Sequence, residues 1–137
     1  MALLLGLVPA GCTTAIGAPA GIEVDKDVTF PITIEKVWYR TKKVRLFGKA
    51  YEASGKLAIS ETEVEFTHKK GRIRIPGDSM RRVIRGKLSP DITNEWVIVH
   101  YAEEGNEEVA AFKGALFAGD EVDAQIYSAV VHLLEAN

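Results

Sequence analysis

The sequence is poor in the residues that most often build metal and redox sites. Among its 137 residues there are one cysteine, Cys12, and three histidines. A single cysteine cannot form a disulfide within the chain and cannot build a cysteine-based metal site. His68, His100 and His132 do not stand at the spacing of a metal-binding pair, such as two histidines on one helix face. We therefore expect neither a bound metal nor a cofactor.

The chain also lacks a net charge that would select a partner. Its 17 basic and 19 acidic residues leave a formal charge of −2. The distribution is uneven: residues 36–90 contain fifteen Lys or Arg and five Asp or Glu, whereas residues 91–137 contain one and ten. Two explanations remain open. Basic and acidic strands compensate each other side by side, or a basic face meets anionic lipid or another polyanion.

Sequence motifs of catalysis are absent as well. There is no G-x-S-x-G elbow, no glycine loop that would cradle a phosphate, and no paired carboxylates in a recognisable arrangement. Residues 76–79 read Pro-Gly-Asp-Ser, which predicts a turn. An enzyme would need a cleft that joins residues such as Ser79 and His100. We expect a binding protein with no catalytic residues.

Residues 1–21 differ from the rest because they carry no charged side chain. The apolar run Ala2–Val8 is far shorter than the ~20 residues that span a bilayer, but it has the length of a signal-peptide core. Val8-Pro9-Ala10-Gly11-Cys12 resembles the lipobox of bacterial lipoproteins, in which small residues precede a lipidated cysteine. The resemblance implies that Cys12 carries a lipid, that 13–21 is a flexible tether, and that the domain 22–137 is displayed on the cell envelope. The chain would then meet membrane and not nucleic acid.

An alternative for the same segment remains open. Free cysteine is commonly buried, so 1–21 could be an ordered part of the fold. The chain would then be a cytoplasmic interaction domain.

The residues after 27 alternate in the way that half-buried strands do. Val28–Ile34 has this period, and Pro31 restricts it to an edge strand or to one that begins after the proline. Tyr51–Ser60 is a further strand, in which Gly55 indicates a bulge or a sharp bend. A two-residue turn at Lys70-Gly71 would place Phe66 opposite Ile75, with every apolar side chain of this hairpin on one face.

The second half of the chain predicts three more strands and a helix. The strands are expected at 80–88, 95–102 and 109–113, and the acidic stretch 103–108 is expected to be a hairpin loop. The segment 96–101, WVIVHY, is apolar on both faces, as in a strand that is covered on both sides. At 100° per residue, 120–137 forms an amphipathic helix; the apolar stripe comprises Val122, Ile126, Ala129, Val130 and Leu133, with Tyr127 and Leu134 at its edge.

These elements predict a mainly β (α+β) fold of six or seven short antiparallel strands in a small bent barrel or sandwich, capped by one C-terminal helix. The strand sequences at 55–60, 64–66, 73–76 and 96–101, followed by the closing helix, resemble the pleckstrin-homology-like superfold, and the GRAM-type branch most of all. The resemblance covers about residues 43–137. It implies a bent seven-stranded barrel that binds phospholipid headgroups or peptides.

Four basic residues form the candidate binding patch: Arg40, Lys42, Lys43 and Arg45. They precede Tyr51–Ser60, which we take as the first strand of the barrel, whereas lipid-binding relatives carry a basic cluster between the first two strands. We expect a non-catalytic, lipid-anchored binding domain whose partner is a lipid headgroup or a protein. A soluble barrel that carries a lipid or a small molecule is the main alternative.

Overall fold

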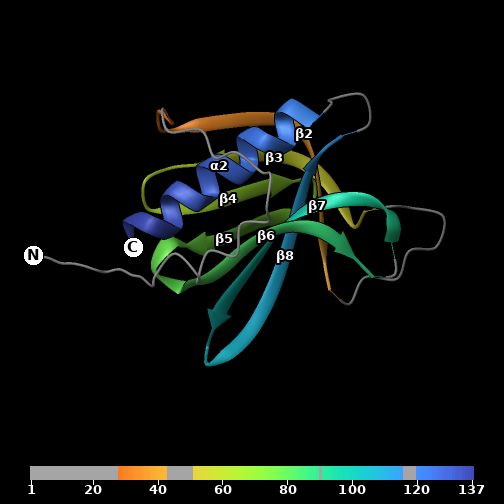
Figure 1. The fold of residues 1–137 in the computed structure, drawn as a ribbon. Helices are drawn as coiled ribbons and strands as arrows, with labels where there is room; N and C mark the ends of the chain where they lie inside the picture. Colours follow the sequence, from red (N-terminus) through yellow and green to blue (C-terminus); the bar gives the residue numbers. More distant parts are fainter. Residues whose placement is uncertain (1–27, 43–50, 90, 116–119) are drawn as a thin grey trace, which may run out of the picture.

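The computed structural model describes residues 28–42, 51–89, 91–115 and 120–137. They form seven strands, one short 3-10 helix and one α-helix (Figure 1). In chain order the elements are β2 (Ile32–Thr41), β3 (Ala53–Ile59), β4 (Glu63–His68), β5 (Gly71–Pro76), η1 (Gly77–Ser79), β6 (Met80–Leu88), β7 (Asp91–Glu103), β8 (Asn106–Gly114) and α2 (Asp120–Ala136).

All seven strands belong to one antiparallel sheet with the order β5-β4-β3-β2-β8-β7-β6. The sheet does not close, because β5 and β6 each pair on one side only. Helix α2 crosses one face of this bent sheet (Figure 1). The mainly β fold with a C-terminal helix is therefore confirmed. The strand β2 begins after Pro31, which was one of the two arrangements that the proline allowed.

The helix buries the predicted apolar stripe against the sheet. Ile126, Ala129, Val130 and Leu133 are fully buried and join the main core. Tyr127, expected at the edge of the stripe, is fully buried too, whereas Val122 is only partly covered. Each large aliphatic side chain that leaves water contributes about 1.5–3 kcal/mol. The helix is therefore part of the core and not an appendage.

Asp123 attaches the start of this helix to the end of β8. Its side chain is buried, and Oδ1 accepts a hydrogen bond from the backbone N–H of Gly114 at 2.7 Å. Lys113 Nζ lies 3.6 Å from the other carboxylate oxygen. Burial raises the pKa of Asp123, while the contacts with Gly114 and Lys113 oppose that rise. The carboxylate thus fixes the first turns of α2 against the end of β8.

The sheet bends where β2 carries a bulge. The pairing of β2 with β3 shifts between Ile34 and Val37, and Lys36 within the bulge has a φ of 56°. Regular pairing resumes with Val37 opposite Gly55. A Cβ atom on Gly55 would lie 2.1 Å from the carbonyl oxygen of Thr67, so no side chain fits there. The predicted irregularity at Gly55 is therefore a close approach between strands, with the bulge on the neighbouring strand.

Two hairpins depart in detail from the sequence prediction. In β4–β5, Phe66 pairs with Ile73 and not with Ile75, because the turn is at Lys69-Lys70. The shift is by two residues, so the predicted faces are right although the register is wrong.

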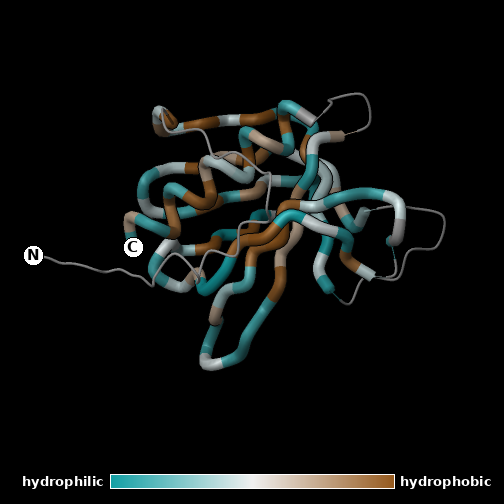
Figure 2. Tube along the Cα trace, viewed as in Figure 1, coloured by the Kyte–Doolittle hydropathy of each residue, from teal (hydrophilic) through white to brown (hydrophobic). Residues whose placement is uncertain are grey.

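The β7–β8 hairpin has no six-residue loop. The strands continue until Glu103 pairs with Asn106, and the turn consists of Glu104 and Gly105 alone. Both turn residues have positive φ, 51° and 84°, as a type I′ turn requires. The acidic stretch is thus a rigid pair of strands. It projects beyond the body of the sheet, and its tip is hydrophilic (Figures 1 and 2).

Candidate functional site

The face of the sheet opposite α2 has a small apolar cluster of its own. It is built around Trp96, Ile98 and Ala111, all of them buried. The partly buried side chains that pack against this cluster are Trp38, Tyr51, Ile84, Leu88 and Val109. The prediction that the WVIVHY segment is covered on both faces is confirmed, since Val97 and Val99 belong to the main core. We call this side of β2, β8, β7 and β6 the outer face.

Arg40 is buried beside this cluster and is not part of a surface patch. It is 0% exposed, and its guanidinium donates to the carbonyl oxygens of Leu88 and Ser89, both at 2.7 Å. The guanidinium carbon also lies 5.9 Å from the ring centroid of Trp96. Burial lowers the pKa of Arg40, while the carboxylate of Asp91 opposes this shift. The side chain therefore ties the end of β6 to β2 and is not available to a surface ligand.

Asp91 completes the same buried network. Its Oδ2 accepts a hydrogen bond from Trp96 Nε1 at 3.1 Å, and its Oδ1 accepts from the backbone N–H groups of Thr93 and Asn94. Burial alone would raise the pKa of Asp91, but the hydrogen bonds from Asn94, Thr93 and Trp96 outweigh it and lower the pKa to about 2. The network fixes the start of β7 and with it the position of the outer face.

A shallow pocket of about 420 Å³ opens on the outer face. Its lining comes from four strands and from the turn that follows β2: Thr41, Lys42, Arg82, His100, Glu107, Glu108 and Val109. Strand register explains why three of these residues gather on the outer face, because Arg82 pairs with His100 and His100 pairs with Val109. Residues that pair across antiparallel strands project from the same face. The pocket thus depends on the alignment of β6, β7 and β8.

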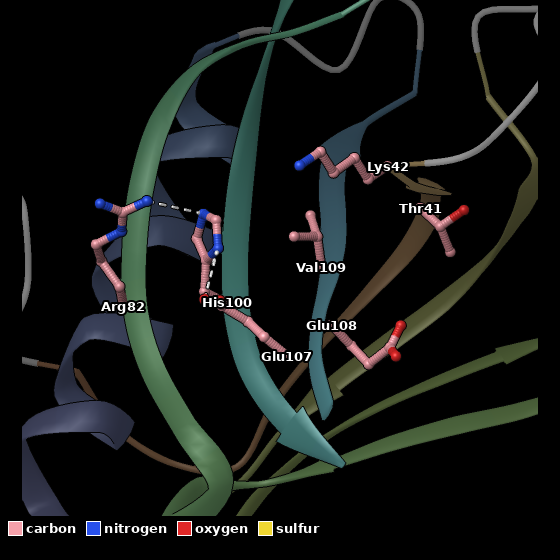
Figure 3. Close-up of a pocket in the computed structure, with 7 residues that line it drawn as sticks. All are labelled: Thr41, Lys42, Arg82, His100, Glu107, Glu108 and Val109. Atoms are coloured by element: carbon pink, nitrogen blue, oxygen red, sulfur yellow. Dashed lines mark hydrogen bonds and ion pairs between the residues drawn. The ribbon is translucent and has the colours of Figure 1, made fainter. Parts of the chain in front are cut away.

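The polar side of the pocket is a row of three side chains from β6, β7 and β8. Arg82 Nη2 lies 3.2 Å from His100 Nε2, and His100 Nδ1 lies 3.6 Å from Glu107 Oε2 (Figure 3). Burial lowers the pKa of His100 and Arg82 lowers it further, while Glu107 opposes both effects. An uncharged imidazole is therefore favoured at neutral pH, with one ring nitrogen facing a cation and the other a carboxylate.

Of the residues predicted to bind an anion, the structure places Lys42 at this pocket. Lys42 is exposed, and Figure 3 shows its amine on the same side of β8 as Val109. Arg40 lies in the buried network instead. Lys43, Arg45 and the proposed lipid-bearing Cys12 lie outside the described residues. The structure thus separates Arg40 from Lys42, although the two are close in sequence.

The sequence did not single out Arg82 or Glu107 and treated His100 as a strand residue. Alternation from Trp96 and Ile98 would have placed His100 on the outer face, but its neighbours on β6 and β8 depend on strand register.

Ser79 and His100 have other partners: Ser79 Oγ donates to the Pro76 carbonyl oxygen at 2.7 Å, and His100 contacts Arg82 and Glu107. Within the described ranges there is no group of three or more His, Cys, Asp or Glu side chains that could hold a metal ion. No helix in the described part of the chain is long and apolar enough to cross a membrane.

Comparison with known proteins finds a likeness in structure alone. No protein-family model matches the sequence, and no curated protein matches it. Among solved structures, a chain from "The 8S snRNP Assembly Intermediate" is similar, with a TM-score of 0.58 and 9% sequence identity. The match covers 85% of this chain and 91% of the other. At this identity the likeness is one of fold.

Proposed function

We propose that this chain is a non-catalytic binding domain that is held at the bacterial cell envelope by a lipid on Cys12 and binds an anionic group beside the connection between β2 and β3. The observation that carries the proposal is the position of the basic segment. Lys42 directly follows β2 and lines the outer-face pocket, and Lys43, Arg45 and Lys49 follow it before β3 begins.

The order of the described strands supports a different placement of this cluster relative to the barrel. Among the strands that the structure describes, β2, Ile32–Thr41, comes first, and it pairs with β3, which covers most of the segment that begins at Tyr51. In the sequence, the basic residues after Thr41 therefore stand between β2 and β3, the first two strands that the structure describes. In the pleckstrin-homology-like resemblance, lipid-binding members carry their basic cluster on this connection. The seven strands and the closing helix further support that resemblance.

The main core lies between α2 and the face of the sheet that α2 covers. Its packing favours binding of a ligand at the surface of the domain over carriage of a ligand inside it. Phe66 and Phe112 from the sheet and Ile126 and Leu133 from α2 are fully buried against one another in a single cluster. Interiors that are filled in this way have little room for a guest molecule. A soluble carrier of lipid would need these side chains to move apart.

The lipid anchor is tested by the intact mass of the native protein from membranes, beside a Cys12→Ser variant. The expected result is a mature chain that starts at Cys12 and carries acyl mass, which the variant lacks. An unmodified chain that retains residues 1–11 contradicts the anchor and leaves a cytoplasmic interaction domain.

Anion binding is tested separately by co-sedimentation of the 137-residue chain with vesicles that contain phosphatidylglycerol. A variant with Lys42→Gln, Lys43→Gln and Arg45→Gln should lose most of the binding at low salt. The matched control neutralises Lys69, Lys70 and Arg72 at the β4–β5 turn, where all three residues are exposed. Equal losses in the two variants indicate unspecific attraction and contradict a site beside β2.

A further inference from the structure

The row of Arg82, His100 and Glu107 has a defined hydrogen-bonding direction. An arginine side chain carries only donors, so Arg82 can donate to His100 Nε2 only if that nitrogen has no proton. The proton of the neutral ring is then on Nδ1, which faces Glu107 Oε2 at 3.6 Å. A second proton on the imidazole would occupy Nε2, remove the acceptor and place two cations against each other. Protonation of His100 would therefore free the guanidinium of Arg82.

The pocket lining has balanced charge while His100 is neutral. Lys42 and Arg82 carry positive charge, and Glu107 and Glu108 carry negative charge. The Glu108 carboxylate is directed away from the Arg82–His100 pair in Figure 3. Glu107 has a side chain that is 69% exposed, so it can turn into solvent. One proton on His100 makes the lining positive, and movement of Glu107 adds to that change.

We propose that the outer-face pocket binds a compact anionic group of the phosphate or sulfate type between Lys42 and Arg82, and that a proton on His100 strengthens this binding. The inference rests on the proposed function and names the ligand chemistry and the regulation of the same site. The group can belong to a lipid headgroup or to a free anion, since both present the same charged oxygens to the pocket.

The charged groups around His100 come from every strand beside it. Arg82 on β6 lowers the pKa of His100, Glu107 on β8 raises it, and Lys42 after β2 lowers it. A bound anion adds negative charge at the place where two cations now disfavour the proton. By linkage, the anion raises the pKa of His100 to the same extent that the proton tightens anion binding.

The direct test follows the imidazole signals of the 137-residue chain by NMR during pH titrations with and without sodium sulfate, at constant ionic strength. Sulfate keeps its charge over the range in which histidine titrates. One added unit charge at about 4 Å in a solvent-like dielectric corresponds to roughly fivefold tighter binding by the protonated than by the neutral form of His100. Binding should therefore be tighter at pH 5 than at pH 7.5, by at most that factor. We expect sulfate to raise the pKa of His100 and to leave His68 and His132 unchanged.

Matched variants separate the pocket from general salt effects. Arg82→Gln should abolish the sulfate-dependent shift of His100, whereas Arg81→Gln, an exposed neighbour on the same strand, should preserve it. A His100 pKa that does not respond to sulfate overturns the inference. An equal shift of all three histidines overturns it too.

Vesicle binding distinguishes this inference from the proposed function. If phosphatidylglycerol vesicles bind at the basic segment but sulfate leaves His100 unchanged, the proposed function stands and the pocket is not the site. If sulfate shifts His100 but no vesicle binds at either pH, the pocket binds a free anion and the membrane proposal fails. Binding of both, stronger at pH 5, supports the two together and identifies a lipid headgroup as one source.

Discussion

Replacement of Arg40 by alanine should destabilise the protein strongly, because its guanidinium is fully buried and donates to three backbone carbonyl groups. Two hydrogen bonds of 2.7 Å to Leu88 O and Ser89 O would be lost, and a third to Thr41 O at 3.1 Å. A hydrogen bond from a charged group contributes about 1.5–3 kcal/mol. Since water can reach the carbonyl of exposed Ser89, we expect a loss of about 3 kcal/mol in the free energy of unfolding.

That loss is a large share of the 5–15 kcal/mol that stabilises an ordinary domain. The assay is urea unfolding followed by tryptophan fluorescence, since Trp96 lies beside the guanidinium. The melting temperature should fall on the order of 10 °C. Arg40→Lys should rescue little, because an ammonium group cannot reproduce the planar fork that reaches two carbonyls at once.

Arg74 provides the matched control. It is also a strand arginine with a short contact, 2.6 Å to Glu63, but its side chain is 57% exposed. Exposed ion pairs contribute about 0–1 kcal/mol, so Arg74→Ala should change stability little. If Arg40→Ala lowers the free energy of unfolding no more than Arg74→Ala does, the buried hydrogen bonds of Arg40 do not stabilise the fold as argued. A folded Arg40→Ala variant that fails to bind anions would restore Arg40 to the predicted surface patch.

Three further predictions concern the helix and the start of β7. Leu133→Asp should unfold the domain, since it places a charge at a fully buried position; a melting temperature equal to that of the exposed-site control Glu135→Ala contradicts the helix as part of the core. Tyr127→Phe should leave stability unchanged or raise it by about 1 kcal/mol, because the buried hydroxyl has no hydrogen-bond partner among the residues that the structure describes; a loss of similar size, measured by urea unfolding, refutes this. Asp91 has a folded-state pKa of about 2 against a reference value of 3.8, so its contribution is complete above pH 3.8 and disappears as the pH falls through 2. The wild type should lose about 2 kcal/mol more than Asp91→Asn between pH 4 and pH 2, and equal slopes in acid-unfolding curves would rule this out.

The β4–β5 hairpin shows how far alternation alone can go. Period-two alternation identified the faces of Val64, Phe66 and Ile75 correctly, because a slip by one residue would have exposed all of them. It could not distinguish a turn at Lys69-Lys70 from one at Lys70-Gly71, since both keep the same parity. Alternation therefore predicts which face each side chain of this hairpin occupies, and leaves its register open.

The prediction of a loop at the acidic stretch 103–108 was wrong for a different reason. Its composition is typical of a loop, yet the strands continue through it to a two-residue turn at Glu104-Gly105. Gly105 was a signal for such a turn, but positive φ at Glu104 is uncommon for a residue with a side chain. Pairing with β7 along the whole stretch outweighs the local preference.

By itself the sequence determined the order and type of the elements, the buried stripe of α2 and the inward side of most strands, because these follow from periodicities of 2 and 3.6 residues within short segments. Only the tertiary structure decided which side chains from distant strands meet. Arg40 looked like a solvent-exposed member of a basic run, and its burial depends on carbonyl groups 48 and 49 residues away. Arg82, His100 and Glu107 become neighbours only through the register of three strands. Such contacts are long-range, and no local pattern specifies them.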